Sequence, residues 1–299
     1  MKRIGLLFAA LLFVVGSTMA QSEQNKSSVT VSDHSDDNDV IVTQDLDGDD
    51  LNESDVDILG YSDDNDVYIN QDGEDLYSDV SITAGSSDNE VDVNQDNDGH
   101  DSDVDISFLS MNNRVDIDQY GDDQESDVSI SNGSSYNDVY VDQYGEDNES
   151  DVDIANLSLG NVVDVEQDGD DNESDVSISN FSNANSVEVS QYGEDNVSSV
   201  DIYNGSGDLL FEGNMVVVGQ DGEKLDSDVE IGDDSDDNYV NISQEDKNHE
   251  SDVLIFSGSD RNDIMVNQEG NYSTSDVEVS YGSDDNYIDI NQKKWSHSY

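Results

Sequence analysis

The sequence predicts an all-β protein, a two-sheet β-solenoid of about eleven 24-residue strand-turn-strand repeats. Three observations predict this fold: glutamine recurs every 24 residues in all but two intervals, asparagine stands six residues before each of these glutamines, and β-branched residues alternate with polar ones. A fixed internal period is the signature of stacked supersecondary units. The two recurring amides are Asn38, Asn65, Asn89, Asn113, Asn137, Asn161, Asn185, Asn214, Asn238, Asn262 and Asn286, and Gln44, Gln71, Gln95, Gln119, Gln143, Gln167, Gln191, Gln220, Gln244, Gln268 and Gln292.

The first strand of each unit lies before the glutamine. β-Branched residues stand four and two positions before it, as in Val40 and Val42 or Ile264 and Val266. Alternation with a period of two indicates a strand with one buried face.

The second strand follows a short turn. Serine stands seven positions after the glutamine, followed by valine and then isoleucine or valine, as in Ser126, Val128 and Ile130. Glycine often stands two positions after the glutamine, as at Gly145, where we expect a turn residue with positive φ. A return arc then leads to the next unit. The two longer intervals are interpreted as loops, within 45–53 and 207–213.

One unit has too little apolar surface to fold alone, so like strands should stack about 4.8 Å apart. Valine and isoleucine then form a dry interior, and the recurring asparagines, glutamines and serines join it. The amides can form side-chain ladders, each carbonyl accepting from an amide in the neighbouring rung.

The segments outside the repeat suggest export. Residues 1–20 have the pattern of a signal peptide, with Lys2 and Arg3 before an apolar run and small residues before Gln21. A short segment, 21–26, leads to the repeats at 27–292, and 293–299 form a tail. No later stretch is long and apolar enough to predict membrane insertion. Cys and Pro are both absent, which excludes disulfides and leaves every strand amide free to bond.

A net charge of −65 makes nucleic acid and anionic membranes poor partners and cations good ones. Such charge is also typical of disorder, but disorder would not keep the amide register. Aspartates eight positions after the glutamines should form an outward column, from Asp55 and Asp79 to Asp276. Asp-rich turns offer oxygen ligands suited to Ca²⁺, although solvated charge explains them as well. We therefore expect no cofactor except Ca²⁺, with candidate ligands Asp45, Asp47, Asp49, Asp96 and Asp98.

Nothing in the sequence predicts an enzyme. Carboxylates occur everywhere, so none marks an acid/base site. The four histidines, at 34, 100, 249 and 297, have no metal-ligand spacing and are expected at the surface. Tyr120, Tyr144 and Tyr192 each follow a glutamine and suit either turn packing or an adhesive face.

The repeat pattern, Asn-x5-Gln-x-Gly-x2-Asn-x-Ser-x-Val-x-Ile, resembles the curlin repeat of curli amyloid subunits. The best matches are 143–148 and 191–196, and the resemblance covers roughly 27–292. Asparagine replaces the leading serine of the curlin pattern, and Ile or Val replaces its second glutamine, as at Ile82 and Ile154. The resemblance implies a secreted bacterial protein that self-associates into extracellular fibres for cell adhesion and biofilm. It also implies a nucleator subunit and an outer-membrane secretion pore as partners.

Three functions remain open on the sequence. The first is a curlin-like amyloid fibre subunit or nucleator. The alternative is a monomeric acidic, cation-dependent (Ca²⁺) β-solenoid surface adhesin. An antifreeze-like solenoid ranks last, because ice binding favours a flat threonine array and threonine is rare here.

Overall fold

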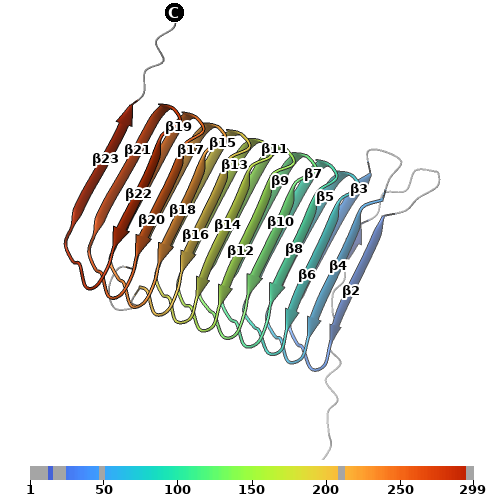
Figure 1. The fold of residues 1–299 in the computed structure, drawn as a ribbon. Helices are drawn as coiled ribbons and strands as arrows, with labels where there is room; N and C mark the ends of the chain where they lie inside the picture. The colour runs from blue at the N-terminus through green and yellow to red at the C-terminus, as the bar shows by residue number, and fades with distance from the viewer. Residues whose placement is uncertain (1–12, 16–24, 47–50, 208–212, 294–299) are drawn as a thin grey trace, which may run out of the picture.

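The computed structural model describes residues 13–15, 25–46, 51–207 and 213–293, and this part of the chain is all-β. Two parallel sheets form the predicted β-solenoid (Figure 1). The first sheet holds the odd-numbered strands: β1 (Phe13–Val15), β3 (Asp39–Leu46), β5 (Asp66–Glu74), β7 (Glu90–Asp98), β9 (Arg114–Asp122), β11 (Asp138–Glu146), β13 (Val162–Asp170), β15 (Ser186–Glu194), β17 (Met215–Glu223), β19 (Tyr239–Lys247), β21 (Asp263–Asn271) and β23 (Tyr287–Lys293). The second holds the even-numbered strands: β2 (Lys26–Ser32), β4 (Glu53–Leu59), β6 (Tyr77–Thr83), β8 (Asp101–Ile106), β10 (Glu125–Ile130), β12 (Glu149–Ala155), β14 (Glu173–Ser179), β16 (Val197–Ile202), β18 (Asp226–Ile231), β20 (Glu250–Ile255) and β22 (Thr274–Val279).

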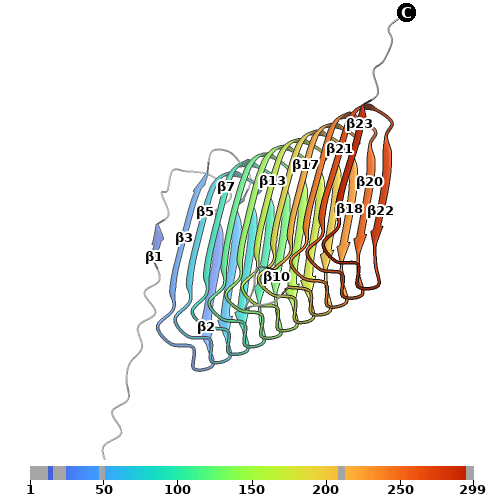
Figure 2. The same cartoon turned by 90° about the vertical axis from the view of Figure 1, so that its left-hand side faces the viewer.

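Each strand pairs with the equivalent strand of the next rung, so equivalent residues stack on one another. Gln143 pairs with Gln167, and the register survives the longer interval from Gln191 to Gln220. Tight turns run along one edge of the solenoid and return arcs along the other (Figure 1). The two sheets face each other across the interior (Figure 2). Residues 47–50 and 208–212, which belong to the two predicted loops, are outside the described part of the chain.

The interior consists of the β-branched positions that the alternation predicts. Val139 and Val141 of the first sheet and Val152 and Ile154 of the second are all 0% exposed. One continuous apolar cluster runs from Val40 to Val279. At about 25 cal/mol per Å² of buried apolar surface, this column is the main favourable term in folding.

The recurring glycine has positive φ as expected, but it lies inside the first strand rather than in the turn. Gly145 is a strand residue with φ 116°, and a Cβ there would meet the carbonyl oxygen of Gly169 at 2.0 Å. Glycine suits the position because the next rung approaches so closely, and only Asn97 (φ 92°) and Asp246 (φ 84°) replace it in the paired rungs between Gly73 and Gly270. The left-handed turn comes two residues later, at Asp147 (φ 54°) and its equivalents. Aspartate and asparagine tolerate that conformation better than most residues.

The ends of the described chain add two details. Strand β1 lies inside the predicted signal peptide and pairs with β3 at the edge of the first sheet. Lys293, assigned by sequence to the tail, is the last residue of β23. No helix capable of crossing a membrane occurs in the described residues.

Candidate functional site: amide ladders and open ends

The recurring asparagines form the first ladder that the sequence predicts. Each Nδ2 donates to Oδ1 of the asparagine one rung closer to the N-terminus, over distances of 2.8–3.1 Å from Asn65 to Asn286. The backbone N–H of Asn161 also donates to Oδ1 of Asn137, at 2.9 Å, which fixes the orientation of that amide. The asparagine ladder therefore has one direction, with its donors facing the N-terminal end.

The glutamines form a second ladder that runs the opposite way. Each Nε2 donates to Oε1 of the glutamine one rung closer to the C-terminus, over 2.7–3.0 Å from Gln44 to Gln292. Nε2 of Gln143 also donates to the carbonyl of Glu125 at 2.9 Å, so the ladder ties the first sheet to the second. Buried amides with every partner in place rigidify a core.

A third buried column, five positions after the glutamine, was not recognised as a ladder from the sequence. Nδ2 of Asn172 donates to Oδ1 of Asn148 at 2.9 Å, and Nδ2 of Asn196 donates to Oδ1 of Asn172 at 3.0 Å. The signal was present in the Asn that closes the Gln-x-Gly-x2-Asn motif. Because leucine, histidine and glutamine also occupy this column, as at Leu76 and His100, its pattern is harder to see.

Two histidines occupy this third column, which corrects the expectation of surface positions. His100 is 0% exposed and His249 is 1% exposed. In His100, Nε2 bonds the carbonyl of Asp96 at 2.9 Å and Nδ1 accepts from the backbone N–H of Gln124 at 3.2 Å. Burial lowers the pKa of His100, so the neutral ring is the stable form. His34 is exposed as expected, and His297 lies outside the described residues.

The serines of the second strand are buried as predicted, but most do not form a ladder. The hydroxyls of Ser78, Ser102, Ser126, Ser150 and Ser174 have no hydrogen-bond partner. Two pairs are exceptions: the Oγ atoms of Ser251 and Ser275 are 3.0 Å apart, and those of Ser198 and Ser227 are 3.4 Å apart.

The predicted aspartate column lies on the outer face of the second sheet, where Asp103, Asp127 and Asp151 stack in register. Burial, and then the neighbouring carboxylates, raise the pKa of Asp103 and of Asp151 to about 6. The salt bridges of the described residues involve other carboxylates, such as Glu223 and Asp285. Repulsion within the column therefore has to be relieved by protons or by solvent cations.

Three of the five candidate calcium ligands lie among the described residues. No group of three or more His, Cys, Asp or Glu side chains in the described part of the chain is arranged to hold a metal ion. Asp45, Asp96 and Asp98 lie at the turn edge, while Asp47 and Asp49 are outside the described residues. Tyr120 and Tyr144 stack with ring centroids 5.2 Å apart, and Tyr192 is 37% exposed.

The two ends of the solenoid expose what the middle buries. Val29 and Val31 at one end and Ile288 and Ile290 at the other are only partly buried, although they belong to the core columns. At the C-terminal end, Oδ1 of Asn286 has no donor among the described residues, and Nε2 of Gln292 keeps one N–H after bonding Thr274. At the N-terminal end, Nδ2 of Asn38 already donates to the carbonyls of Asp36 and Ser62, but the backbone N–H of Asn38 has no acceptor and Oε1 of Gln44 has no donor among the described residues.

These two sets of groups are complementary. A second copy translated along the solenoid axis would place Asn38 on Asn286 and Gln44 on Gln292, donor against acceptor in both ladders. A copy turned end for end would instead oppose acceptor to acceptor and donor to donor. The ends thus allow head-to-tail stacking, in which all copies point the same way, and disfavour the pairing of two like ends.

Comparison with known proteins adds no relative. No family model, no curated protein and no solved structure matches the chain. The curlin pattern is therefore a resemblance in the repeat alone.

Proposed function

We propose that the chain is a secreted structural protein whose copies stack end to end into curlin-like amyloid fibres for cell adhesion and biofilm matrix. The observation that carries this proposal is the pair of open, complementary ends. Cleavage of the predicted leader would remove β1 and leave β3 unpaired on that side, as β2 is, and unpaired parallel edge strands with an exposed apolar interior template the addition of another rung. Solenoids that remain monomeric usually end in polar capping units. Catalysis plays no part in this function.

The curlin-like setting supplies the rest of the proposal. The leader pattern at 1–20 supports export, and an outer-membrane pore would secrete the mature chain. A separate nucleator subunit could start the fibre, or this chain could itself be the nucleator.

The test blocks one end of the solenoid. Lysine at Ile288 and Ile290 places charge where β23 would meet the next copy, while the rungs before it stay intact. The matched control places lysine at Tyr287 and Asp289, which point outward from the same strand. We expect wild type and control to bind amyloid dye and to diffract at about 4.8 Å, and the end variant to stay folded and monomeric. A wild-type chain that remains monomeric in every salt condition would refute the proposal.

The alternative function is the monomeric, Ca²⁺-dependent adhesin, which the aspartate column favours. Burial first, and the neighbouring carboxylates second, raise the pKa values of Asp103 and Asp151, and a bound cation would relieve the repulsion between these carboxylates. A chain that never forms fibres, but adheres to surfaces only with Ca²⁺ present, would support this alternative.

A further inference from the structure

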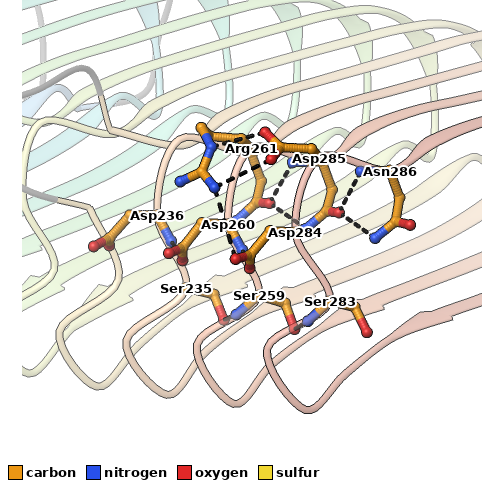
Figure 3. A network of polar contacts seen from close by, with 11 residues as sticks. Ser235, Asp236, Ser259, Asp260, Arg261, Ser283, Asp284, Asp285 and Asn286 are labelled. Carbon is orange, nitrogen blue, oxygen red and sulfur yellow. Dashed lines mark hydrogen bonds and ion pairs between the residues drawn. The ribbon is translucent and has the colours of Figure 1, made fainter.

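Four consecutive return arcs in the middle of the solenoid carry no charged residue, although the chain has a net charge of −65. We call them the uncharged strip, residues 107–113, 131–137, 155–161 and 179–185. Arcs nearer the ends are acidic. Figure 3 shows the C-terminal ones, where Asp236, Asp260 and Asp284 line the edge and Arg261 forms ion pairs with Asp284 and Asp285.

The uncharged strip exposes large apolar side chains. Within it, exposures of 39–67% occur at Phe108, Leu109, Met111, Tyr136, Leu157 and Phe181. Asparagines join them: Asn156 donates to Asn180 at 3.1 Å on the same edge. The strip is thus an apolar and amide surface on a polyanion, which is the composition of an interaction site rather than of a solvated edge.

The backbone also disfavours these residues where they stand. Leu109, Leu157 and Phe181 have φ of 65°, 63° and 68°, in the left-handed region that bulky residues avoid. Other rungs place glycine at this position, as at Gly85 and Gly133. The leucine of the next rung lies across each glycine, since a Cβ there would be 2.9 Å from Leu109 Cδ2 and 2.7 Å from Leu157 Cδ2. Each leucine side chain thus covers the glycine of the preceding rung, so the apolar surface continues from rung to rung.

A structural hydrogen bond is also replaced within the strip. The residue after the buried arc serine normally accepts a backbone N–H from the preceding rung: Asp260 accepts from Asp236 at 3.0 Å, and Asn183 from Leu159 at 2.8 Å. Met111 and Leu159 occupy this same position, and an alkyl side chain cannot accept. Backbone conformation thus opposes Leu109, Leu157 and Phe181, and the lost acceptor opposes Met111 and Leu159. A contact outside the chain would offset these costs.

We propose that the uncharged strip docks the same strip of a second copy of this chain, side by side. A side-by-side approach through either sheet face would instead bring stacked carboxylates together, such as Asp118 and Asp142 of the first sheet or Asp103 and Asp127 of the second. Such charges repel over a Debye length of about 8 Å at 0.15 M salt. Two strips meet without opposing charges, and their side chains recur at the same rung spacing. This pairing needs only the folded chain and does not rest on end-to-end stacking.

The strip is short, roughly 20 Å at about 4.8 Å per rung, so one pair of strips buries less than a standard interface of about 800 Å² per partner. Pairing of single chains should therefore be weak. If copies also stack end to end, many strips act together and the pairing gains avidity.

The experiment removes the apolar side chains without adding charge. The variant L109N/L157N/F181N puts asparagine, which tolerates the left-handed region, at all three positions. The matched control, Y61N/Y281N, changes tyrosines that are 65% and 84% exposed on acidic arcs, where φ is 69° and 60°. Sedimentation velocity of the mature chain measures pairing of single molecules, electron microscopy measures the width of any fibres, and fibre diffraction measures stacking separately.

We expect wild type and control to dimerise as concentration rises and any fibres to run in pairs. The dimer dissociation constant of the strip variant should be at least about ten-fold higher than that of wild type. Its fibres should be unpaired, with the same diffraction spacing as wild type. A strip variant that pairs like wild type would overturn the proposal, and so would a wild type that never pairs. Wild type that sediments with phosphatidylcholine vesicles instead of pairing would identify the strip as a membrane contact and also overturn it.

Discussion

Interior columns differ in how their polar atoms are satisfied. The side chain of Asn161 donates to Asn137 and to the carbonyl of Ser182, and it accepts two bonds from Asn185. The hydroxyl of Ser126 is equally buried but has no partner. The amide column therefore contributes stability and specificity. The serine column fills volume, but burying hydroxyls without hydrogen-bond partners costs free energy.

This contrast makes a prediction. Asn161→Ala leaves several buried groups unpaired and should lower the free energy of unfolding by at least about 2 kcal/mol. Ser126→Ala removes a group that has no partner and should be neutral or raise stability by up to about 1 kcal/mol. Urea unfolding followed by circular dichroism measures both. Equal losses for the two variants would contradict the assignment.

A second prediction concerns His100, whose pKa is lowered mainly by burial. The unfolded chain then binds a proton more readily than the folded one. The contribution to stability is therefore present above the ordinary pKa of about 6.5 and is lost as pH falls through the lowered value. His100→Asn introduces the residue found at Asn148 and Asn172, which should keep the fold and remove this loss. Thermal midpoints at pH 7.5 and pH 5 should diverge between the two proteins, and parallel pH profiles would exclude the effect.

At the scale of the strand, the close approach of rungs decides which glycines matter. A Cβ at Gly145 would collide with the backbone of the next rung, whereas one at Gly219 would have its nearest atom at 3.9 Å. We predict that Gly145→Ala destabilises the solenoid by several kcal/mol, of the order of a strained core insertion. Gly219→Ala, on the outer face of β17, should be neutral or slightly stabilising. Thermal unfolding of the pair tests this, and similar midpoints would refute it.

The features of the fold that the sequence predicts are those that depend on residues recurring at fixed spacing. The strands, their parallel register and the two ladders follow from residues that recur at fixed spacing, such as Asn161 and Gln167. The third column was missed because Leu76, His100 and Asn148 fill it alternately, so burial there depends on shape rather than residue type. The placement of Gly145 inside its strand could not be predicted either, because it depends on the distance between rungs. The directions of the ladders appear only with backbone partners in place.

At the scale of the whole molecule, charge opposes both folding and stacking. A net charge of −65 over eleven rungs is about −6 per rung. At 0.01 M salt the Debye length is about 30 Å, so rungs several repeats apart repel each other. The association of copies should therefore depend on the salt concentration, because salt screens the charges on the sheet faces.

The resulting prediction concerns salt and pH. Fibre growth should be slow at low salt and should accelerate with NaCl, and more with CaCl₂ at equal ionic strength if the aspartate column binds ions. The pKa values of Asp103, Asp142 and Asp151 are raised to about 6, first by burial and then by neighbouring carboxylates. The folded state thus holds protons more tightly than the unfolded chain, and stability should increase as pH falls from about 6 towards 4.

Lag times against NaCl, CaCl₂ and pH measure this dependence. A lag that is independent of all three would rule out electrostatic control. Equal effects of Na⁺ and Ca²⁺ at matched ionic strength would show that the ions act by screening and not by specific binding.

The position of the uncharged arcs along the chain has a consequence for any long assembly. They lie in the middle of the solenoid, between acidic arcs on both sides, so stacked copies would alternate neutral and acidic bands. One band of each kind would recur per molecule, about every 50 Å at about 4.8 Å per rung. A fibre that looks uniform in its backbone would thus be striped in its charge, and cationic stain should reveal the length of a single subunit as an axial repeat.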